Sequence, residues 1–420
     1  MRRLGVIVDA YSTGNKLARE FSAYGVECFH VQSRDPILIF DAPSFVPEDF
    51  AGNFVYRGDV AKLAEDIGKL SPSFVIAGCE SGVPLADALS EVLKLPSNGT
   101  PMSSARRDKF LMQAALKDAG VEHIRSLRTA LAAEAITWCD RHCAWPCVVK
   151  PLDSAGSDGV TFCHSPNELR AAFASLLGRE NAMGTVNTLL IVQERLVGEQ
   201  YIVNTVSLQG SHYVSEVWKD VRLDVPGACA VGYYEELLES ASTESTVLGR
   251  YAGSVLDALE IQNGPAHLEI MLVEGRGPVL IEVGARMQGS ICDSVVLSAL
   301  NHSHVTLTAL CYADPNGFTS YSSTPYQVRK PVLAAMLVSP RNLRVSDSRF
   351  PSAIRALPSY AADQGLPMSG TSIKRTIDME TCPGIVYLSH ESAEVFQADY
   401  VRLRELEVQM YEEAVEEVDV

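Results

Sequence analysis

Two glutamates in the second half of the chain are spaced so that they could bind one metal ion. Glu269 and Glu282 each lie in a segment where apolar and polar residues alternate, as in β-strands, and turn-forming residues separate the two segments. A hairpin centred between Gly275 and Arg276 would make the two carboxylates direct cross-strand partners. Hard oxygen ligands that act together with nucleotide phosphates are typical of a Mg²⁺ site. Two solvated acids on a surface hairpin would give the same local pattern.

Three basic residues could stabilise negative charge near these acids. Arg286 follows Glu282 by four residues, and Lys150 closes an apolar strand segment. Lys109 lies in a predicted helix, where a solvated lysine is the commoner case. The small residues of Ser154–Gly159, which follow Lys150, would let backbone N–H groups approach phosphate oxygens. The order GxxxxGK[ST] of a Walker loop is absent from this stretch.

A third segment has the character of a hinge between domains. The apolar run Leu189–Glu194 predicts a strand, and Arg195–Tyr201 continues it as a polar link. Exposed backbone in such a link could pair with the edge of an adenine ring. An ordinary strand end followed by a loop is the alternative.

The elements that must position these residues begin with an alternating α/β pattern. Strands are predicted at 4–9, 26–31, 54–57 and 74–78, and helices at 16–24, 59–70 and 84–94. This alternation favours a parallel sheet whose ligands lie at the carboxyl ends of the strands. Gly78–Gly82 occupies such an end, which makes Glu80 and Ser81 candidate site residues.

The rest of the chain divides at a turn-rich break, Pro96–Pro101. We expect an N-terminal α/β domain over 1–98, a linker helix at 104–119 with a small α/β unit over 99–205, and a larger unit over 206–420. The larger unit should hold antiparallel strands around a helix at about 242–260, and an acidic amphipathic helix at 400–418.

Composition excludes several classes of protein. The 420 residues carry a net charge of −17, which disfavours binding to nucleic acid or to anionic membranes. No apolar run approaches the roughly 20 residues of a membrane helix, and Met1–Asp9 is too short for a signal peptide, so we expect a cytoplasmic protein. Of the ten cysteines, Cys139, Cys143 and Cys147 cluster with His142, but no second CxxC pair supports a zinc site.

The order of these elements is more specific than any one of them. It runs through Lys109, Lys150-Pro151, the 154–159 loop, Gln193-Glu194-x-Leu196-x-Gly198, Glu269, Glu282 and Arg286. This order resembles the ATP-grasp superfamily across roughly residues 105–315. The resemblance implies an α/β (α+β) ATP-grasp fold with a Rossmann-like pre-ATP-grasp domain in front.

The resemblance also implies a role for each residue. Lys109 and Lys150 would contact the α- and β-phosphates of ATP, and Ser154, Gly156 and Ser157 would cover them. Gln193, Glu194 and Leu196 would hold adenine. The family usually places a glutamate on the ribose where this chain has Gln200, and Glu199 is a rival. Glu269 and Glu282 would hold Mg²⁺, with Mn²⁺ as an alternative, and Arg286 matches the catalytic arginine. Gly284 stands where the family often has asparagine, which leaves a third metal ligand open.

Within the superfamily, Gly78–Val83 and Val203–Ser207 resemble the bacterial L-amino-acid ligases of the bacilysin-synthetase type. That likeness implies a dipeptide synthetase that joins two amino acids through an aminoacyl phosphate, in a protein that is a homodimer. The expected substrate-binding residues are Glu80, Ser81, Arg286, Gly289 and Ser290, with Tyr233, Tyr234 and Glu235 as weaker candidates. The small Ser290 suggests room for a larger side chain.

Two other functions remain open at this point. One is an ATP-grasp carboxylase or a purine-pathway type ligase that acts on carboxyphosphate. The other is a nucleotide-binding regulatory module that has lost catalysis, although the intact charged residues argue against such a loss.

Overall fold

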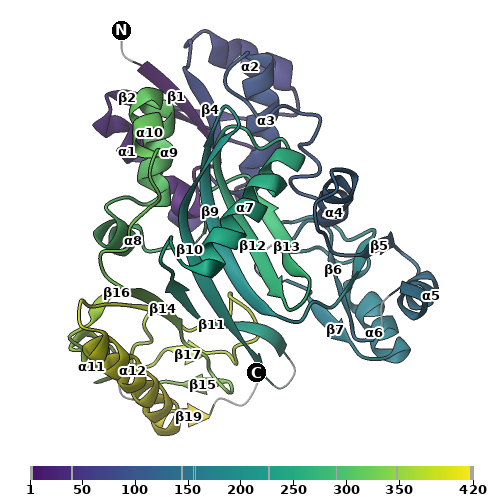
Figure 1. Ribbon diagram of the computed structural model, residues 1–420, viewed down its shortest axis with the longest axis vertical. Coiled ribbons are helices and arrows are strands. Elements are labelled where there is room, and N and C mark those ends of the chain that lie inside the picture. Colours follow the sequence, from purple (N-terminus) through teal and green to yellow (C-terminus); the bar gives the residue numbers. More distant parts are fainter. Residues whose placement is uncertain are drawn as a thin grey trace.

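In the part of the chain that the computed structural model describes, the fold consists of four β-sheets with helices packed on them (Figure 1). The structure describes residues 3–38, 41–142, 145–154, 156, 158–225, 228–289, 291–346 and 349–416. Ser157 and Ser290, both expected in the site, lie outside these residues, as does Cys143. The large sheet lies in the middle of the view, the N-terminal sheet above it, the small sheet at its side and the C-terminal strands and helices below.

The N-terminal sheet is parallel, as the alternating pattern predicts, with the strand order β3–β2–β1–β4. Its elements are β1 (Arg3–Val8), η1 (Ser12–Lys16), α1 (Leu17–Ala23), β2 (Val26–Gln32), β3 (Asn53–Val55), α2 (Val60–Gly68), β4 (Phe74–Ala77), η4 (Glu80–Gly82) and α3 (Val83–Val92). The loops after β1 and β4 lie against each other, because a Cβ atom on Gly82 would be only 2.5 Å from the carbonyl oxygen of Val8. This close approach requires glycine and brings Asp9, Glu80 and Ser81 to one edge of the sheet.

The small sheet is antiparallel, with the order β5–β8–β6–β7. Its elements are β5 (Ser126–Thr129), α5 (Ala132–His142), β6 (Cys147–Pro151), β7 (Thr161–Cys163), α6 (Pro166–Leu176) and β8 (Leu190–Glu194). The preceding helix, α4 (Lys109–Asp118), begins later than the predicted residue 104. The Asp108 carboxylate accepts hydrogen bonds from the N–H groups of Phe110 and Leu111 and so caps the helix there. Lys109 is therefore the first helical residue.

The large sheet has eight strands in the order β13–β12–β9–β10–β11–β14–β18–β16, all paired antiparallel. The strands are β9 (Glu199–Leu208), β10 (Ser211–Val225), β11 (Ala228–Leu237), β12 (Gly264–Val273), β13 (Gly277–Gly284), β14 (Val332–Met336), β16 (Tyr360–Gln364) and β18 (Ile385–Ser389). The helix expected near 242–260 is α7 (Thr243–Ala258). The expected domain boundary at 205 falls inside β9, whereas the chain passes from the small sheet to the large one at 195–198. The division into domains stays a prediction.

Three helices follow β13: α8 (Asp293–Leu300), α9 (His304–Ala313) and α10 (Pro315–Tyr321). Of these, α9 packs against α1 of the N-terminal domain and against β9. The C-terminal part packs on the far end of the large sheet, and its further elements are β15 (Leu343–Arg344), α11 (Arg349–Arg355), β17 (Ser372–Ile373), α12 (Ala393–Glu413) and β19 (Val415–Glu416). The acidic helix begins at Ala393 rather than at the predicted residue 400, because Ser392 caps it. One face of this helix buries Phe396, Leu403 and Met410 in an apolar cluster with β14 and β18.

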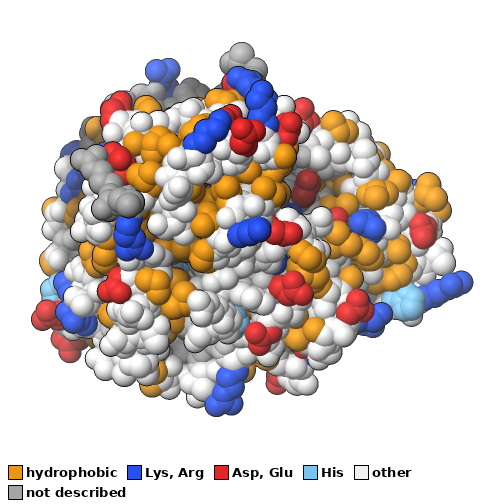
Figure 2. All heavy atoms as spheres, turned by 90° about the horizontal axis from the view of Figure 1, so that it is seen from above, with side chains coloured by type: hydrophobic (Ala, Val, Ile, Leu, Met, Phe, Trp, Pro, Cys, Tyr) orange, Lys and Arg blue, Asp and Glu red, His pale blue; other side chains and the backbone are white. Residues whose placement is uncertain are grey.

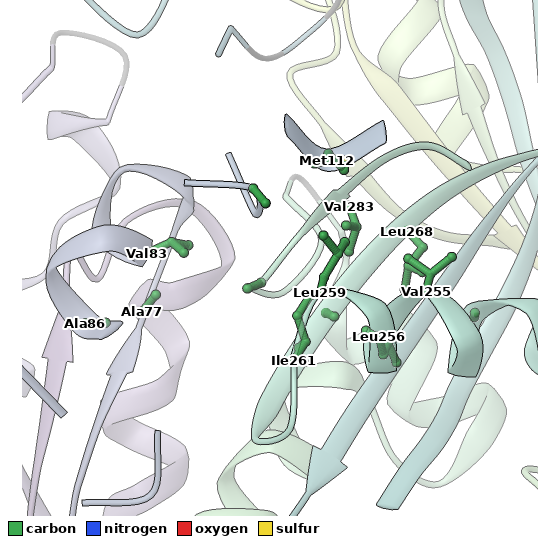
Figure 3. Packing of buried hydrophobic residues seen from close by; sticks show 14 of the residues in the cluster. Ala77, Val83, Ala86, Met112, Val255, Leu256, Leu259, Ile261, Leu268 and Val283 are labelled. Atoms are coloured by element: carbon green, nitrogen blue, oxygen red, sulfur yellow. The ribbon is translucent and has the colours of Figure 1, made fainter. Parts of the chain in front are cut away.

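The main apolar cluster joins the N-terminal sheet to the large sheet (Figure 3). Ala77, Val83 and Ala86 contribute from the N-terminal side, and Leu256 and Leu268 from α7 and β12. Side chains alternate along a strand, so the opposite face of the large sheet carries the residues between these apolar ones. That opposite face is polar near β12 and β13, and it forms the floor of the site.

A buried arginine strengthens the same junction. Arg106 is fully buried and its guanidinium lies 2.9 Å from the Asp87 carboxylate of α3. It also donates to the carbonyl oxygens of Leu259 and Glu260, which follow α7. Removal of one partner from a buried ion pair typically costs about 3–5 kcal/mol. The N-terminal domain is therefore attached to the large sheet by both apolar and polar contacts.

The surface carries charges of both signs. On the face shown in Figure 2, Asp and Glu side chains are interspersed with Lys and Arg, so the net charge of −17 is not gathered into one acidic patch there. Across the described ranges, no helix has both the length and the apolar composition that would let it cross a membrane.

Candidate active site

A cavity of about 220 Å³ lies between the small sheet and the large sheet. Its walls include every described residue for which the sequence predicts a contact with ATP or the metal ion. These are Lys109, Lys150, Ser154, Gly156, Gln193, Glu194, Leu196, Gln200, Glu269 and Glu282. We call this space the nucleotide cavity. Residues almost 175 positions apart in the sequence thus meet around one space.

The two glutamates are direct cross-strand partners, but by a different route from the expected one. Pairs such as Val273 with Gly277 centre the turn on Gly275, whose φ is +71°. A β-bulge then shifts the register between Ile270 and Glu269, so that Glu282 comes opposite Glu269. The extra residue is Ile281, and it faces the nucleotide cavity beside Glu282.

Two lysines face these acids. Lys109 Nζ lies 3.0 Å from Glu282 Oε2 and donates to the Ser154 carbonyl oxygen at 2.6 Å. Lys150 is 7% exposed, and its burial, with the charge of Lys109, lowers its pKa to about 8, although Glu282 and Glu269 act in the opposite direction. The helix start and the end of β6 therefore present two cations to one end of the cavity, as phosphate binding requires.

A polar network on the floor of the cavity surrounds Glu269. Gln200 Nε2 donates to Glu269 and to Asp220, both at 3.0 Å. Arg222 lies 2.8 Å from Asp220 and 3.6 Å from Glu269. Burial alone would raise the pKa of Glu269, but the nearby His267 and the charge of Arg222 outweigh it and lower that pKa to about 2. Glu269 is therefore held as a carboxylate.

Gln200 and Glu199, the two candidates for a contact with the ribose, have different surroundings. Gln200 lines the nucleotide cavity. Glu199 does not line this cavity but an adjoining one, and its carboxylate accepts hydrogen bonds from Lys219 at 2.5 Å and from the Tyr201 hydroxyl at 2.8 Å. Of the two rivals, Gln200 is the one in the wall of the nucleotide cavity, and the ribose contact stays a prediction.

Other parts of the cavity wall are apolar, and one buried donor there lacks a partner among the described residues. The apolar lining comprises Ile124, Val148, Val160, Phe162, Leu196, Met271 and Ile281. Gln193 Nε2 is buried without a hydrogen-bond partner in the described part of the chain. The Glu194 carboxylate, by contrast, is occupied by Arg125 and Arg276 at 2.6–3.0 Å. An apolar slot with one free donor fits a flat heteroaromatic ring.

The two glutamates fit a divalent cation only if other oxygen ligands are supplied. Among the described residues, no group of three or more His, Cys, Asp and Glu side chains could hold a metal. Phosphate oxygens and water would complete the coordination, as is usual for Mg²⁺. Gly284 cannot be replaced by a third ligand without displacement, because a Cβ there would lie 2.6 Å from Glu80 Oε2 and 3.1 Å from Arg286 Nε.

A second cavity, of about 430 Å³, adjoins the first. It is lined by Glu80, Ser81, Arg286 and Gly289, which the sequence predicts to bind substrate. Gly156 and Met379 line both cavities, so the two spaces share a wall. We call this space the donor cavity, where donor means the amino acid whose carboxylate would be activated.

The second cavity contains the arginine expected to be catalytic. Arg286 Nε donates to Glu80 Oε2 at 2.8 Å, and Arg107 donates to Glu80 Oε1 at 2.7 Å. Burial raises the pKa of Glu80, but the two arginines outweigh it and bring it down to about 2. The Ser81 hydroxyl donates to the Asp9 carboxylate at 2.6 Å. A carboxylate from the N-terminal domain thus fixes an arginine of the large sheet.

Other candidates lie elsewhere. Tyr233 stacks on the Arg404 guanidinium at 3.9 Å, and Tyr234 packs in the C-terminal cluster, so neither lines a cavity described above. Glu235 accepts a hydrogen bond from Gln288 on the polar face of the large sheet. Cys139 and Cys147 are fully buried in the core of the small sheet, and His142 is exposed.

Several lining residues were not predicted from the sequence. Arg222, Asp41, Met183, Met287, Met379 and Glu380 belong to this group. Arg222 and Met287 lie in or beside strands already assigned to the site, so the alternation of the strands could have found them. The others lie on loops without a local signal, because only tertiary contacts bring them there.

The chain belongs to the ATP-grasp family of ATP-dependent carboxylate–amine ligases. The family model described as an ATP-grasp domain matches residues 143–295. Enzymes of this family use ATP together with a divalent metal ion.

The chain is also similar to individual ligases. The chain is 30% identical to dapdiamide A synthase of Enterobacter agglomerans over 97% of its own length and 96% of the relative. It is 21% identical to the L-arginine-specific L-amino acid ligase of Bacillus subtilis over 63% of this chain and 65% of that one. The solved L-amino acid ligase from Bacillus licheniformis has the same fold, with a TM-score of 0.75, 16% identity and 99% coverage of both chains.

Proposed function

We propose that this protein is an L-amino-acid ligase that uses ATP to join two unprotected amino acids into a dipeptide, with release of ADP and phosphate. The observation that carries this proposal is the common wall of the two cavities. Gly156 and Met379 line both, and Arg286 lies in the second one beside the metal-site strand β13. A carboxylate bound near Arg286 would therefore adjoin the phosphate end of the nucleotide.

The nucleotide would be held along the first cavity. Lys109 and Lys150 would contact its phosphates, and the loop with Ser154, Gly156 and Ser157 would cover them. The apolar slot with Gln193 Nε2, Glu194 and Leu196 would take adenine. Gln200 would face the ribose. Support comes from the shared cavity of the described residues and from the free Gln193 donor.

The metal would be Mg²⁺, with Mn²⁺ as an alternative, and Glu269 and Glu282 would hold it. When bound, the ion would offset the charge of the phosphate oxygens during transfer. The direct opposition of Glu269 and Glu282 across β12 and β13 supports this assignment, because one divalent cation could contact both carboxylates there. Lys109 already partners Glu282 and would adjust when phosphate oxygens arrive.

The reaction would proceed in two steps within the closed site. The carboxylate of the first amino acid attacks the γ-phosphate and gives an aminoacyl phosphate and ADP. The amine of the second amino acid then attacks the acyl carbon, and phosphate leaves. Arg286 would stabilise the negative charge that develops in both steps, and Glu80 holds its guanidinium in place. Exclusion of water by the 154–159 loop, closed over the phosphates, would protect the acyl phosphate from hydrolysis.

The remaining substrate candidates are Glu80, Ser81, Gly289 and Ser290. Glu80, Ser81 and Gly289 line the second cavity, which supports a role in holding the first amino acid. For Ser290 the support is its position four residues after Arg286. The resemblance further implies a homodimer, which sedimentation equilibrium of the purified protein would test.

A phosphate-release screen over all pairs of amino acids tests the proposal. We expect release of phosphate and ADP that depends on amino acids, with a dipeptide detected by mass spectrometry. Release that depends on bicarbonate and needs no amino acid would favour a carboxylase instead. Absence of any amino-acid-dependent release would reject the ligase.

A further inference from the structure

The walls of the donor cavity are more acidic than basic. Three acids line it, Asp41, Glu80 and Glu380, and Arg286 is the one Lys or Arg among its described lining residues. Glu80 is already paired with two arginines, and Glu380 is exposed to solvent. The question is what Asp41 does.

Asp41 is buried and has no partner of its own. It is 7% exposed, and its carboxylate makes no hydrogen bond or ion pair with any residue that the structure describes. Asp41 precedes the short helix η2 (Ala42–Ser44), where an aspartate usually caps the helix. Here the side chain makes no capping bond, and the Ser44 hydroxyl donates instead to the Asp41 carbonyl oxygen at 2.7 Å. The carboxylate is thus left to the cavity.

A second buried acid stands behind the same wall. Asp9 is 1% exposed and is held by the Ser33 N–H at 2.8 Å and the Ser81 hydroxyl at 2.6 Å. Burial raises the pKa of Asp41 to about 6, and the charge of Asp9 adds to that effect. A positively charged ligand group beside Asp41 would favour the ionised carboxylate and so oppose both the effect of burial and the effect of Asp9 on this pKa.

We propose that Asp41 binds the protonated amine of the amino acid whose carboxylate is activated. This proposal rests on the ligase function proposed above and names the group that the donor cavity recognises. The apolar part of the donor would lie against Met183, Met287 and Met379, whose flexible side chains can adapt to different chain shapes. Either the α-amine or a side-chain amine can supply this ammonium group, and the experiment separates the two sources.

Such pairing would also fix the direction of the reaction. An ammonium group held by a carboxylate has no free electron pair and cannot attack an acyl phosphate. The amine that Asp41 holds would therefore stay unreactive, and the acceptor amine, which Asp41 does not hold, would form the peptide bond. An amino acid without the matching ammonium group would bind the donor cavity less tightly, so Asp41 would help select which amino acid becomes the N-terminal residue.

Asp41→Asn tests this inference because it removes the charge and keeps the shape. The donor that gives the highest rate in the amino-acid screen is compared with its analogue that lacks the α-amine and with one that lacks any side-chain amine. KM is measured for each, or the inhibition constant where no turnover occurs. We expect Asp41→Asn to raise KM for the donor about 10- to 100-fold, as for loss of a charged hydrogen bond, with KM for ATP unchanged.

If the wild type and Asp41→Asn have equal KM values, or equal inhibition constants, for one of the two analogues, then the amine that this analogue lacks is the amine that Asp41 holds. Glu48→Gln is the matched control. Glu48 is exposed in the same loop and does not line the cavity, and its substitution removes one negative charge, as Asp41→Asn does. An unchanged KM for the donor in Asp41→Asn would overturn the inference. So would equal losses for the donor and for both analogues, since they would reveal a structural effect.

If the wild type shows no amino-acid-dependent release of ADP, the proposed function itself has failed. Calorimetric titration of the same amino acids into the wild type and Asp41→Asn, with ADP and Mg²⁺ present, then decides about Asp41. Weaker binding to the variant supports the inference, and equal binding or no binding to either protein overturns it.

Discussion

The nucleotide cavity and the donor cavity share a wall but differ in how their charges are balanced. In the nucleotide cavity, Lys109 lies 3.0 Å from Glu282, and Arg222 lies 2.8 Å from Asp220. In the donor cavity, Glu80 is paired but the buried Asp41 is not. The first is suited to a ligand whose own charges are neutralised by lysines and a metal ion. The second needs a positive charge from the ligand.

The two cavities also differ in where their walls come from. The nucleotide cavity is built almost wholly from residues 109–282, mainly in strands and at their ends, with Lys109 at the start of α4 and residues of the 154–159 loop. The donor cavity collects residues from loops spread from Ser12 to Glu380. On the proposed function, the ATP chemistry is thus placed mainly on regular elements, whereas the choice of substrate would lie on loops, which vary more readily.

The largest effect is expected from Glu282→Ala, which tests the charge balance of the first cavity. Turnover should fall about 1,000-fold or more, because one carboxylate would hold the metal poorly and metal assistance supplies several kcal/mol. Steady-state ADP release measures this effect. Glu274→Gln is the control, since Glu274 is exposed in the turn of the same hairpin. Wild-type activity in Glu282→Ala would remove the metal assignment.

Gly284→Asn tests whether the two cavities compete for space. The new side chain should displace the Glu80–Arg286 pair and lower kcat about 10- to 100-fold, as expected for overpacking that costs about 1–3 kcal/mol. Gly284→Ala should show a smaller loss, and the loss should shrink further in the Glu80→Ala background if the clash is the cause. A gain in metal affinity with kcat unchanged would contradict this view.

A substitution at position 290 should change the second cavity alone. With Ser290→Trp, we expect the relative kcat/KM for large and small donors to shift about 10-fold or more, since pocket shape is worth about 1–3 kcal/mol. KM for ATP should stay within about twofold. Ser298→Trp, at an exposed position of α8, serves as the control. An unchanged donor profile would take residue 290 out of the cavity wall.

The smallest effect is a pH dependence that belongs to the nucleotide cavity. Burial and Lys109 lower the pKa of Lys150 to about 8, so the lysine loses its proton, and its attraction for phosphate, as the pH rises through that value. We expect kcat/KM for ATP to be about fourfold lower at about pH 8.5 than at neutral pH. Lys150→Arg stays charged across this range and should lack the decline. A decline of the same size in that variant would assign it to another group.

Much of the fold was predictable, because its signals are local. The parallel N-terminal sheet, the small sheet and α7 follow from alternation and from turn residues. The Glu269–Glu282 pairing was predicted correctly, although the assumed turn was wrong and the bulge at Ile281 compensates for it. The start of α4 was misplaced because Asp108, rather than an earlier residue, caps it. Helix caps and bulges are decided by single hydrogen bonds that periodicity does not encode.

The donor cavity was predictable only in part. Glu80 and Arg286 stand at strand ends and could be recognised there. Asp41 looks like an ordinary helix cap in the sequence Asp-Ala-Pro-Ser, and only the structure reveals that it does not cap. Met379 lies 93 residues beyond Arg286 and reaches the site through the packing of the C-terminal part. No local pattern reports such long-range contacts.

The apolar cluster that continues from the N-terminal sheet into the large sheet limits how this enzyme can be re-engineered. A chimaera that takes its first 98 residues from a relative would replace Ala77, Val83 and Ala86 but keep their partners on α7 and β12. It would also separate Asp87 from Arg106. Exchange of substrate loops alone, with both sides of this junction kept from one parent, is the safer graft.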